Sequence, residues 1–178
     1  MIICGIDEAG RGTLAGDLAV AGVVLIRKIE GLKDSKKLSR ERREKLFDII
    51  CANSIYHIAL INAAAIDKTG LSRALASGLR EIKNAVRADI YIYDGNCAFG
   101  VEAITTQIKA DACVEEVSAA SILAKVSKDR SLLLLAENYP QYGFEKHQGY
   151  GVKAHIEAIK KYGYTPFHRR SFVVKELL

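Results

Sequence analysis

Residues 2–12 read Ile2-Ile3-Cys4-Gly5-Ile6-Asp7-Glu8-Ala9-Gly10-Arg11-Gly12, an apolar run that ends in two adjacent acids and a Gly-Arg-Gly turn. An apolar run of this length predicts a buried β-strand. Carboxylates at the end of a buried strand cost free energy unless a cation or hydrogen bonds meet them. Neighbouring side chains of a strand point to opposite faces, so a site shared by Asp7 and Glu8 requires the strand to end or bend, which Gly10 and Gly12 permit. An ordinary strand end with a solvated acidic turn is the alternative.

The composition is that of a globular protein, with 49% hydrophobic and 26% charged residues. We therefore expect residues 1–178 to form a single domain with its own core. The sequence has no run of about 18 apolar residues and no basic leader, so we predict neither a membrane span nor a signal peptide. The four cysteines form no CxxC pair, which favours free thiols in a reducing, cytoplasmic setting over disulfides or zinc ligands.

Further β-rich and helical segments follow the first run. The β-rich runs Leu18–Ile26, Ile55–Ile61, Ile90–Tyr93 and Ala103–Ile108 predict strands, the first of them in a hairpin with residues 2–8. Helical periodicity predicts helices over residues 40–52 (with Ser39 as N-cap), 63–86 (which Gly70 can break), 117–136 and 152–162. Residues 142–150 are predicted as a loop. Strands first and alternating helices and strands later predict an α/β domain with a mixed sheet.

Three β-rich segments end in carboxylates, namely Asp7-Glu8, Asp94 and Asp111. Strand ends at one edge of a sheet can bring such side chains together, and carboxylates a few ångströms apart repel strongly in a low dielectric. Divalent cations relieve that repulsion, and oxygen ligands favour Mg²⁺ or Mn²⁺. Two such ions suit in-line phosphoryl displacement. Acids that merely decorate loops are the alternative.

Basic side chains accompany the acids. The net charge is +5, and residues 33–45 carry seven basic side chains against three acids. The stretches around Lys36 and Arg169 would bind a polyanion beside the site. A solvated helix face is the alternative for residues 33–45.

The motifs occur in a fixed order along the chain: DEAGRG at 7–12, DSKKLS at 34–39, YDG at 93–95, KAD at 109–111, SAASILAKVSKD at 118–129, GYG at 149–151 and HRRSF at 168–172. Taken together, they resemble ribonuclease HII, the type 2 ribonuclease H family. The resemblance implies an α/β ribonuclease H-like fold, with a five-stranded mixed sheet flanked by helices and a C-terminal helical segment.

The same resemblance implies a metal-dependent endonuclease. Its substrates would be RNA–DNA hybrids and DNA that contains ribonucleotides, nicked 5′ of an embedded ribonucleotide to leave 5′-phosphate and 3′-hydroxyl ends. The family's acidic cluster, catalytic and metal-binding, corresponds to Asp7, Glu8, Asp94 and Asp111, with Asp129 as a rival for the fourth place. The implied cofactor is Mg²⁺ or Mn²⁺, two ions with substrate bound, and we expect a monomer.

Substrate contacts also follow from the resemblance. Gly10-Arg11-Gly12 resembles the turn that reads the ribose 2′-hydroxyl, since a backbone without Cβ atoms can approach the minor groove closely. Tyr150 resembles the tyrosine at the RNA–DNA junction, with a packing tyrosine as the alternative. Lys36 and Lys37 are expected to contact phosphates. Arg169, with its neighbours Arg170 and His168, either does the same or packs the tail.

The chain departs from the family pattern at three positions. Thr13 and Asp17 stand where prolines are usual, which predicts a looser turn. Val152 replaces a common threonine and removes one possible hydroxyl contact. Two alternatives to this enzyme remain from the sequence: a non-catalytic nucleic-acid-binding module, and a nuclease for another phosphodiester.

Overall fold

The computed structural model describes residues 1–32 and 35–177, so Lys33 and Asp34 of the predicted basic stretch lie outside the described residues. Five strands form one mixed sheet in the order β3-β2-β1-β4-β5, which confirms the predicted architecture. The strands are β1 (Ile3–Ala9), β2 (Leu18–Leu25), β3 (Ser54–Ile61), β4 (Ile90–Asp94) and β5 (Thr105–Gln107). β1 pairs antiparallel with β2 in the predicted hairpin, and it pairs parallel with β4. β4 in turn pairs parallel with β5.

The helices are α1 (Arg40–Ala52), α2 (Ala63–Thr69), α3 (Leu71–Ala85), α4 (Glu115–Asn138), α5 (Phe144–His147) and α6 (Lys153–Tyr162). Ser39 caps α1 by accepting a hydrogen bond from the Arg42 N–H, as predicted. Gly70 divides α2 from α3 with a φ of +82°, a conformation that favours glycine. The prediction of a loop over residues 142–150 is wrong where α5 forms. Within the described residues, no helix combines the length and apolar character that crossing a membrane requires.

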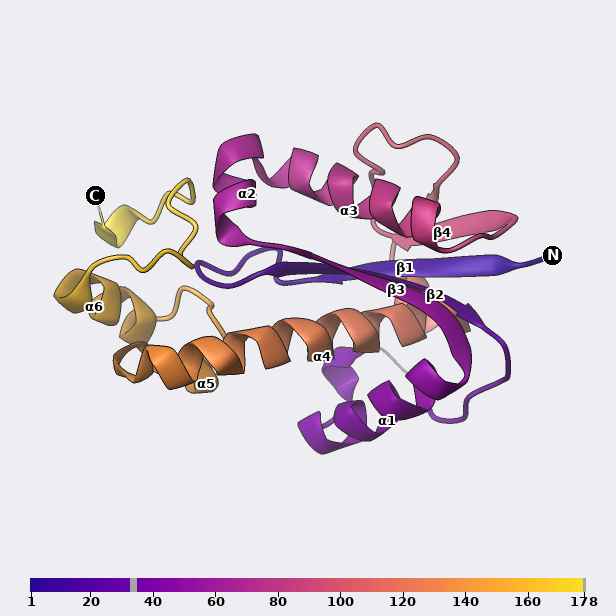
Figure 1. Cartoon of the computed structure of the whole chain (residues 1–178), viewed down its shortest axis with the longest axis horizontal. Helices are drawn as coiled ribbons and strands as arrows, with labels where there is room; N and C mark the ends of the chain where they lie inside the picture. Colours follow the sequence, from indigo (N-terminus) through magenta and orange to yellow (C-terminus); the bar gives the residue numbers. More distant parts are fainter. Residues whose placement is uncertain (33–34, 178) are drawn as a thin grey trace.

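Helices cover both faces of the sheet (Figure 1). On one face, α2 and α3 pack on Leu18 and Val20 of β2 through apolar residues that include Leu75 and Leu79. On the other face, α1 and α4 pack on the alternate β2 residues, among them Val23. Because both faces are covered, β2 is buried along nearly its whole length.

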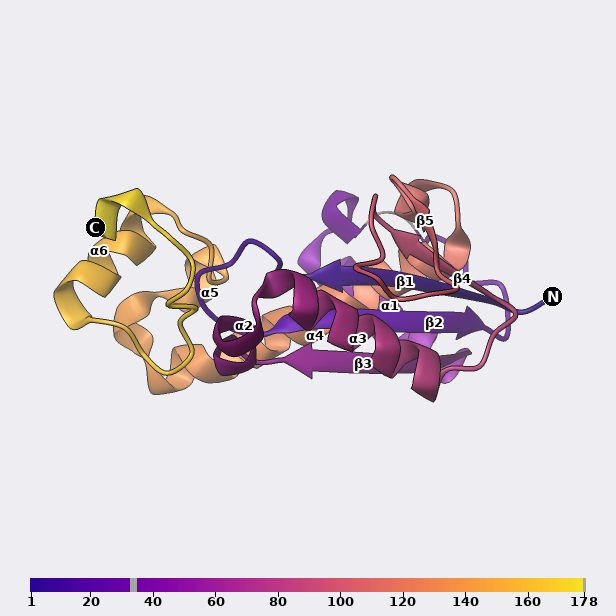
Figure 2. The same ribbon diagram turned by 90° about the horizontal axis from the view of Figure 1, so that it is seen from above.

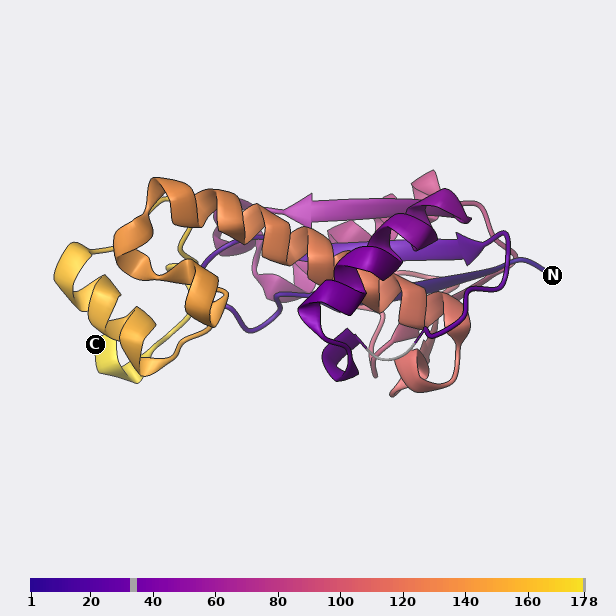
Figure 3. The same cartoon turned by 90° about the horizontal axis from the view of Figure 1, so that it is seen from below.

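The long helix α4 crosses the sheet beneath β1 and β2, with α1 beside it (Figure 3). Gly5 of β1 permits this close approach. A Cβ atom at Gly5 would come within 2.2 Å of backbone atoms of Glu116 and Val117. The glycine in the first apolar run therefore sets how closely the backbone of α4 lies against β1.

The C-terminal segment forms a separate small core at the far end of α4, with α5 and α6 (Figure 2). Its buried residues include Ala15, Leu132, Phe144 and Ile159. Isolated β-bridges join Thr13 to Tyr150 and Ala15 to His168. The loop between β1 and β2 is thus held between the GYG segment and the C-terminal tail.

Candidate active site

Two of the predicted acids come from adjacent parallel strands. Ile6 of β1 is in register with Tyr93 of β4, and the next residue of each strand is an aspartate, Asp7 and Asp94. Parallel strands end at the same edge of a sheet, so the two side chains emerge side by side. The expectation that neighbouring strands bring these two acids together is therefore correct, although β1 itself continues to Ala9.

Asp111 reaches the same place by a different route. β5 ends at Gln107, and Lys109 then adopts a left-handed conformation with a φ of +59°. The turn leads into a short 3-10 helix over Ala110–Ala112. The Ala110 N–H donates a hydrogen bond of 3.2 Å to Asp94 Oδ1, and the Ser118 hydroxyl donates to the Asp111 carbonyl. Asp111 is therefore positioned by a turn and not by a strand end.

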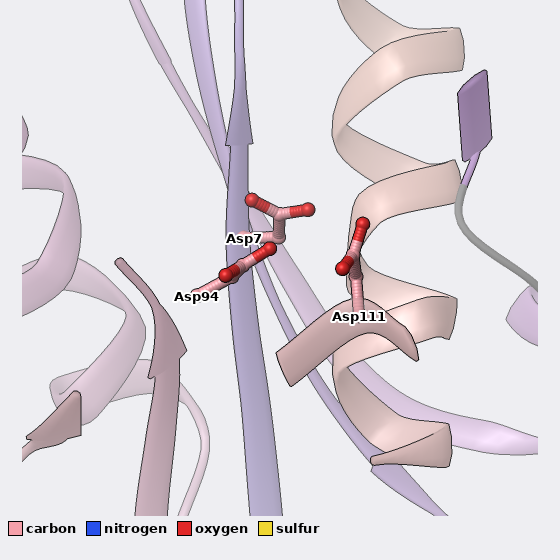
Figure 4. Close-up of side chains that lie close together, drawn as sticks. All are labelled: Asp7, Asp94 and Asp111. Atoms are coloured by element: carbon pink, nitrogen blue, oxygen red, sulfur yellow. The ribbon is translucent and has the colours of Figure 1, made fainter. Parts of the chain in front are cut away.

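The carboxylates of Asp7, Asp94 and Asp111 point toward one another (Figure 4). One oxygen from each lies within 4.8 Å of the others. Among residues 1–32 and 35–177, these three side chains form the group of potential metal ligands. Asp129, the rival for the fourth place, instead accepts hydrogen bonds from Lys125 at 2.9 Å and Lys128 at 3.4 Å. The geometry thus joins Asp111, and not Asp129, to the two strand aspartates.

Glu8 lies beside this group and not within it. β1 continues through both acids and ends at Ala9, so Asp7 and Glu8 point differently. Glu8 accepts a 2.7 Å hydrogen bond from the Tyr93 hydroxyl, and the Arg11 guanidinium lies 3.7 Å from it. Glu8 nevertheless lines the same cavity as Asp7 and Asp111.

The electrostatics of the site disfavour negative charge without a counterion. Burial raises the pKa of Asp7 well above its ordinary value, and the charges of Glu8, Asp94 and Asp111 raise it further. Burial also raises the pKa of Glu8, which the hydrogen bond from Tyr93 partly offsets. A compact set of oxygen donors with excess negative charge matches the preference of hard divalent cations. The residues present therefore fit a Mg²⁺ or Mn²⁺ site.

The cavity beside the carboxylates has a volume of about 330 Å³. Its lining includes several predicted substrate contacts, namely Gly10, Arg11, Gly12, Lys36 and Tyr150. Lys37 follows Lys36 on the short 3-10 helix Ser35–Lys37 and is exposed. The glycine turn, a basic side chain and an aromatic ring thus surround one hollow next to the acids.

Two residues of α4 also line this cavity, Ser121 and Lys125. Both belong to the stretch that resembles the family's long helix, where the sequence left Ser121 open between a structural role and a substrate contact and gave Lys125 no role of its own. The Lys125 ammonium donates to Asp129 at 2.9 Å and to the Gln148 side chain at 2.8 Å. The available signal was the four-residue spacing of Ser121, Lys125 and Asp129, which places all three on one face of a helix.

Tyr150 is 44% exposed at the rim of the cavity. Its ring lies over Lys128, whose ammonium is 5.2 Å from the ring centroid. Lys128 itself is buried and donates a 2.6 Å hydrogen bond to the Gln148 carbonyl. Burial lowers the pKa of Lys128 to about 8. The Tyr150 ring therefore packs against Lys128, and the residue remains partly exposed to solvent.

Arg169 requires a correction. The sequence placed it among the phosphate contacts, but the residue is only 1% exposed. Its guanidinium donates hydrogen bonds to carbonyl oxygens of Gly10 at 2.6 Å and Gly16 at 3.0 Å. With its donors turned inward, Arg169 binds the loop between β1 and β2 and does not face a substrate. The alternative considered for it, packing of the tail, is the one the structure supports.

Thr13 and Asp17, the two positions where the family usually has prolines, do not loosen the turn as predicted. Thr13 is buried, and its hydroxyl donates a 3.1 Å hydrogen bond to the Gly10 carbonyl. Asp17 accepts a 2.5 Å hydrogen bond from the Ser131 hydroxyl of α4. Side-chain hydrogen bonds therefore tie down the turn that the missing prolines led us to expect as looser.

A carboxylate cluster at the carboxyl edge of a five-stranded mixed sheet, beside a basic and aromatic hollow, defines a metal-dependent nuclease with the ribonuclease H-like fold. Residues 4–175 match the family described as Ribonuclease HII. The chain belongs to the ribonuclease HII family. It is an endonuclease that acts on RNA in RNA–DNA hybrids, and nicking of DNA 5′ of embedded ribonucleotides is the activity of this family.

Relatives in sequence and structure agree with this assignment. The ribonuclease HII of Sulfurovum sp. is 57% identical over 175 residues, which cover 98% of this chain and 93% of the relative. The Archaeoglobus fulgidus ribonuclease HII, solved in complex with PCNA, superposes with a TM-score of 0.85 at 26% identity, covering 98% of this chain and 96% of that one. The ribonuclease H2 of Pyrococcus horikoshii OT3 gives a TM-score of 0.79 at 30% identity, with 97% and 94% covered.

Proposed function

We propose that Asp7, Glu8, Asp94 and Asp111 bind two divalent cations, Mg²⁺ or Mn²⁺, when the substrate is in place. The observation that carries this proposal is the carboxylate group itself, with oxygens of Asp7, Asp94 and Asp111 within 4.8 Å of one another. Negative charges this close, in surroundings that raise the pKa of Asp7, are stabilised by a hard cation. Glu8 is the fourth carboxylate because it lines the same cavity.

Divalent cations held by Asp7, Glu8, Asp94 and Asp111 would supply activation of water for attack on a phosphodiester and neutralisation of charge on the leaving oxygen. The chain's own contribution is to hold the ligands still. Pairing of β1 with β4 fixes Asp7 against Asp94, and the hydrogen bond from the Ala110 N–H to Asp94 fixes the turn that carries Asp111. Preorganised ligands of this kind lower the reorganisation needed during the reaction. Cleavage would leave 5′-phosphate and 3′-hydroxyl ends.

The glycine turn is proposed to select the ribonucleotide. Gly12 has open space where a Cβ atom would be, so its backbone can approach a sugar from the solvent side. Arg11 is exposed at the tip of the turn and lies near Glu8. Backbone groups at this place can hydrogen-bond the 2′-hydroxyl, which distinguishes RNA from DNA.

Tyr150 is proposed to stack on the deoxyribose that follows the ribonucleotide. Its ring is supported by Lys128 and borders the cavity that contains the carboxylates and the glycine turn. A 2′-hydroxyl on the following sugar would clash with a ring in this position, which would favour an RNA–DNA junction. Aromatic stacking is typical of protein contacts with nucleic-acid strands.

Lysine side chains are proposed to bind the phosphates on either side of the cleaved bond. Lys36 and Lys125 line the cavity, and Lys37 is exposed on the same 3-10 helix as Lys36. Contacts of this type position the duplex and give affinity that falls with salt, without reading sequence. Arg169 is not included because its donors are directed to backbone carbonyls.

A nicking assay tests the metal assignment. The substrate is a DNA duplex with a single ribonucleotide, incubated with Mg²⁺, with Mn²⁺ or with EDTA. Asp7→Asn and Asp94→Asn are expected to abolish cleavage while duplex binding is largely retained. Near-normal cleavage by either variant would contradict the proposed ligand set. Asp129→Asn, which lies outside the carboxylate group, is the matched control and should keep metal-dependent cleavage.

Two other outcomes of the same assay would point to the alternative functions. Binding without metal-dependent nicking would favour a non-catalytic module. Equal cleavage of an all-DNA duplex would favour a general phosphodiester nuclease, because the glycine turn would then not read the ribose. Selective nicking at the ribonucleotide supports the proposal.

We further propose that residues 1–178 act as one domain and as a monomer in the cytoplasm. The four cysteines are free thiols, which is compatible with a reducing compartment. Sedimentation velocity at micromolar concentration tests the monomer, since a dimer would sediment faster at the same shape.

A further inference from the structure

Two buried histidines form a contact that the catalytic scheme does not use. His155 lies in α6 and His168 in the C-terminal tail, with exposed fractions of 0% and 2%. Their Nε2 atoms are 3.1 Å apart. The pair lies in the C-terminal core with α5 and α6, outside the carboxylate group, yet it connects directly to the backbone of Tyr150.

The two ends of this connection fix its direction. At one end His168 Nδ1 lies 2.9 Å from the Thr165 N–H, which can only donate, and 2.8 Å from the Thr165 hydroxyl, which can donate as well. At the other end the Tyr150 carbonyl, which can only accept, lies 2.9 Å from His155 Nδ1. His168 must therefore carry its proton on Nε2, and His155 must carry its proton on Nδ1. The Nε2–H of His168 then donates to Nε2 of His155, and every bond is made with one ring proton on each histidine.

The surroundings keep both rings neutral. Burial lowers the pKa of His155 to about 4 and that of His168 to about 4. The titratable or charged groups that face the pair disfavour a positive charge: His147 stacks on His155 with centroids 4.4 Å apart, and Arg170 acts on His168. A third proton would also place two N–H groups face to face in the chain of hydrogen bonds.

Several aromatic rings pack against the two histidines. Phe144 meets both rings, with centroids 5.5 Å from His155 and 5.8 Å from His168. The rings of Tyr142 and Tyr164 lie 5.2 Å and 5.5 Å from His168. Close packing of this kind leaves the histidines little freedom to change rotamer. His155 therefore links the tail to the Tyr150 carbonyl, which also accepts a 2.9 Å hydrogen bond from the Val152 N–H.

We propose that His155 and His168 are positioning residues for Tyr150, fixing the backbone of the GYG segment through a hydrogen-bond chain that runs in one direction only. The inference rests on the substrate contact proposed for Tyr150. The β-bridge between Ala15 and His168 ties the same histidine to the loop after the glycine turn. The tail thereby sets the spacing between the two segments proposed to read the substrate.

Ring nitrogen NMR on the unmodified protein tests the hydrogen-bond chain directly. The chain has four histidines, so the signals lost in His57→Gln and His147→Gln identify those two, and the signal lost in His168→Asn then distinguishes His168 from His155. We expect His155 in the Nδ1–H form and His168 in the Nε2–H form, both neutral at pH 6. The opposite tautomer for either ring, or titration of either near the ordinary pKa of about 6.5, would overturn the proposal.

A pair of variants tests the consequence for catalysis. Asn at position 155 keeps an N–H near the position of Nδ1, whereas Gln places its amide near Nε2 and leaves the Tyr150 carbonyl without this donor. His155→Gln is expected to raise KM for the single-ribonucleotide duplex about tenfold with a smaller change in kcat, and His155→Asn to stay within about threefold of the unmodified enzyme. Equal effects of the two variants would contradict the positioning role.

A double-mutant cycle separates positioning from general destabilisation. In a Tyr150→Ala background, His155→Gln should change KM less than about twofold, because the group being positioned is gone. Full additivity would overturn the inference. If Tyr150→Ala alone leaves cleavage unchanged, the proposed contact of Tyr150 fails instead. Should His155→Gln not fold, His168→Asn is used in the same cycle, since it keeps the acceptor for Thr165 and removes the donor to His155.

Discussion

Arg169 Nη1 donates a 2.6 Å hydrogen bond to the carbonyl oxygen of Gly10, which joins the C-terminal tail to the glycine turn that borders the carboxylates. The same guanidinium bridges to the Gly16 carbonyl through Nε at 3.2 Å and Nη2 at 3.0 Å. One buried side chain thus holds both ends of the loop that follows β1. A planar guanidinium can make these bonds together, whereas a lysine ammonium has a different geometry.

Arg169→Lys is therefore expected to lower the free energy of unfolding by about 2–3 kcal/mol, because it leaves buried carbonyl groups without donors. Urea unfolding measures this loss, and the nicking assay should show reduced cleavage as the glycine turn becomes mobile. Arg170→Lys is the matched control, since Arg170 is the next residue and its side chain is exposed. Equal stability of the two variants would show that the bridging geometry is unimportant.

Gly10 and Gly12 offer a comparison within one turn. Gly10 has a φ of +91°, and a Cβ atom there would lie 2.7 Å from the Asp17 carbonyl oxygen. At Gly12 a Cβ atom would meet no protein atom within 4 Å. Gly10→Ala should therefore lower both the melting temperature and cleavage. Gly12→Ala should keep the melting temperature yet lower kcat/KM on the single-ribonucleotide duplex about tenfold or more, because only the substrate can meet the added methyl group.

Unchanged cleavage by Gly12→Ala would mean that the turn does not approach the sugar. The interpretation of Gly12→Ala does not depend on whether Gly10→Ala is stable. Gly10→Ala serves as the control in which the added methyl group clashes with the protein itself. Circular dichroism melting curves for both variants, recorded without substrate, separate the two effects.

Substitutions of Tyr150 separate its ring from its hydroxyl. Tyr150→Phe keeps the aromatic face that lies over Lys128, so cleavage should fall by less than about threefold. Tyr150→Ala removes the ring and should lower kcat/KM by about tenfold or more. Because Tyr150 is 44% exposed, both variants should melt close to the unmodified protein. A larger loss for Phe than for Ala would exclude the stacking role.

The sequence predicts the site best where strand geometry controls it. Asp7 and Asp94 follow from parallel strand pairing, because the register of β1 and β4 brings residues one step past Ile6 and Tyr93 together. Asp111 does not follow in this way: β5 has three residues, and the left-handed Lys109 supplies the turn. The strand-end argument and the motif resemblance both named Asp111, but the strand-end argument gave the wrong reason for its position.

Other features could not be predicted because they depend on tertiary packing. The sequence around Arg169 does not distinguish it from an exposed basic residue. Arg169 is buried only because the tail folds onto residues 10–16. The four-residue helix α5 is too short for a periodicity to be visible. The histidine pair likewise could not be predicted from the sequence, since the two side chains that meet in the core lie thirteen positions apart along the chain.

Metal binding should change stability as well as activity. The pKa of Asp7 is higher in the folded state than the ordinary value of 3.8, so the stability associated with this group is fully present at low pH and is lost as pH rises through the raised pKa. At pH 7 in EDTA, Asp7→Asn should therefore raise the free energy of unfolding, because the asparagine side chain carries no charge to bury. Mg²⁺ should raise the melting temperature of the unmodified protein more than that of the variant.

Melting curves with EDTA and with increasing Mg²⁺ give both comparisons in one experiment. Asp129→Asn is a useful control because Asp129 is paired with Lys125 and Lys128, and removing its charge should destabilise the protein. A stability gain for Asp129→Asn, or none for Asp7→Asn in EDTA, would contradict the assigned electrostatics.

Val152 gives a prediction that concerns stability alone. It occupies the N-cap of α6 in an extended conformation, and its side chain makes no capping hydrogen bond. Threonine can adopt the same backbone and accept a hydrogen bond from an N–H in the first turn, so Val152→Thr should raise the free energy of unfolding by about 1 kcal/mol. Val152→Ala, which lacks the hydroxyl, should give no such gain in urea unfolding. Equal stability of the Thr and Ala variants would show that the first turn of α6 is already satisfied by other groups.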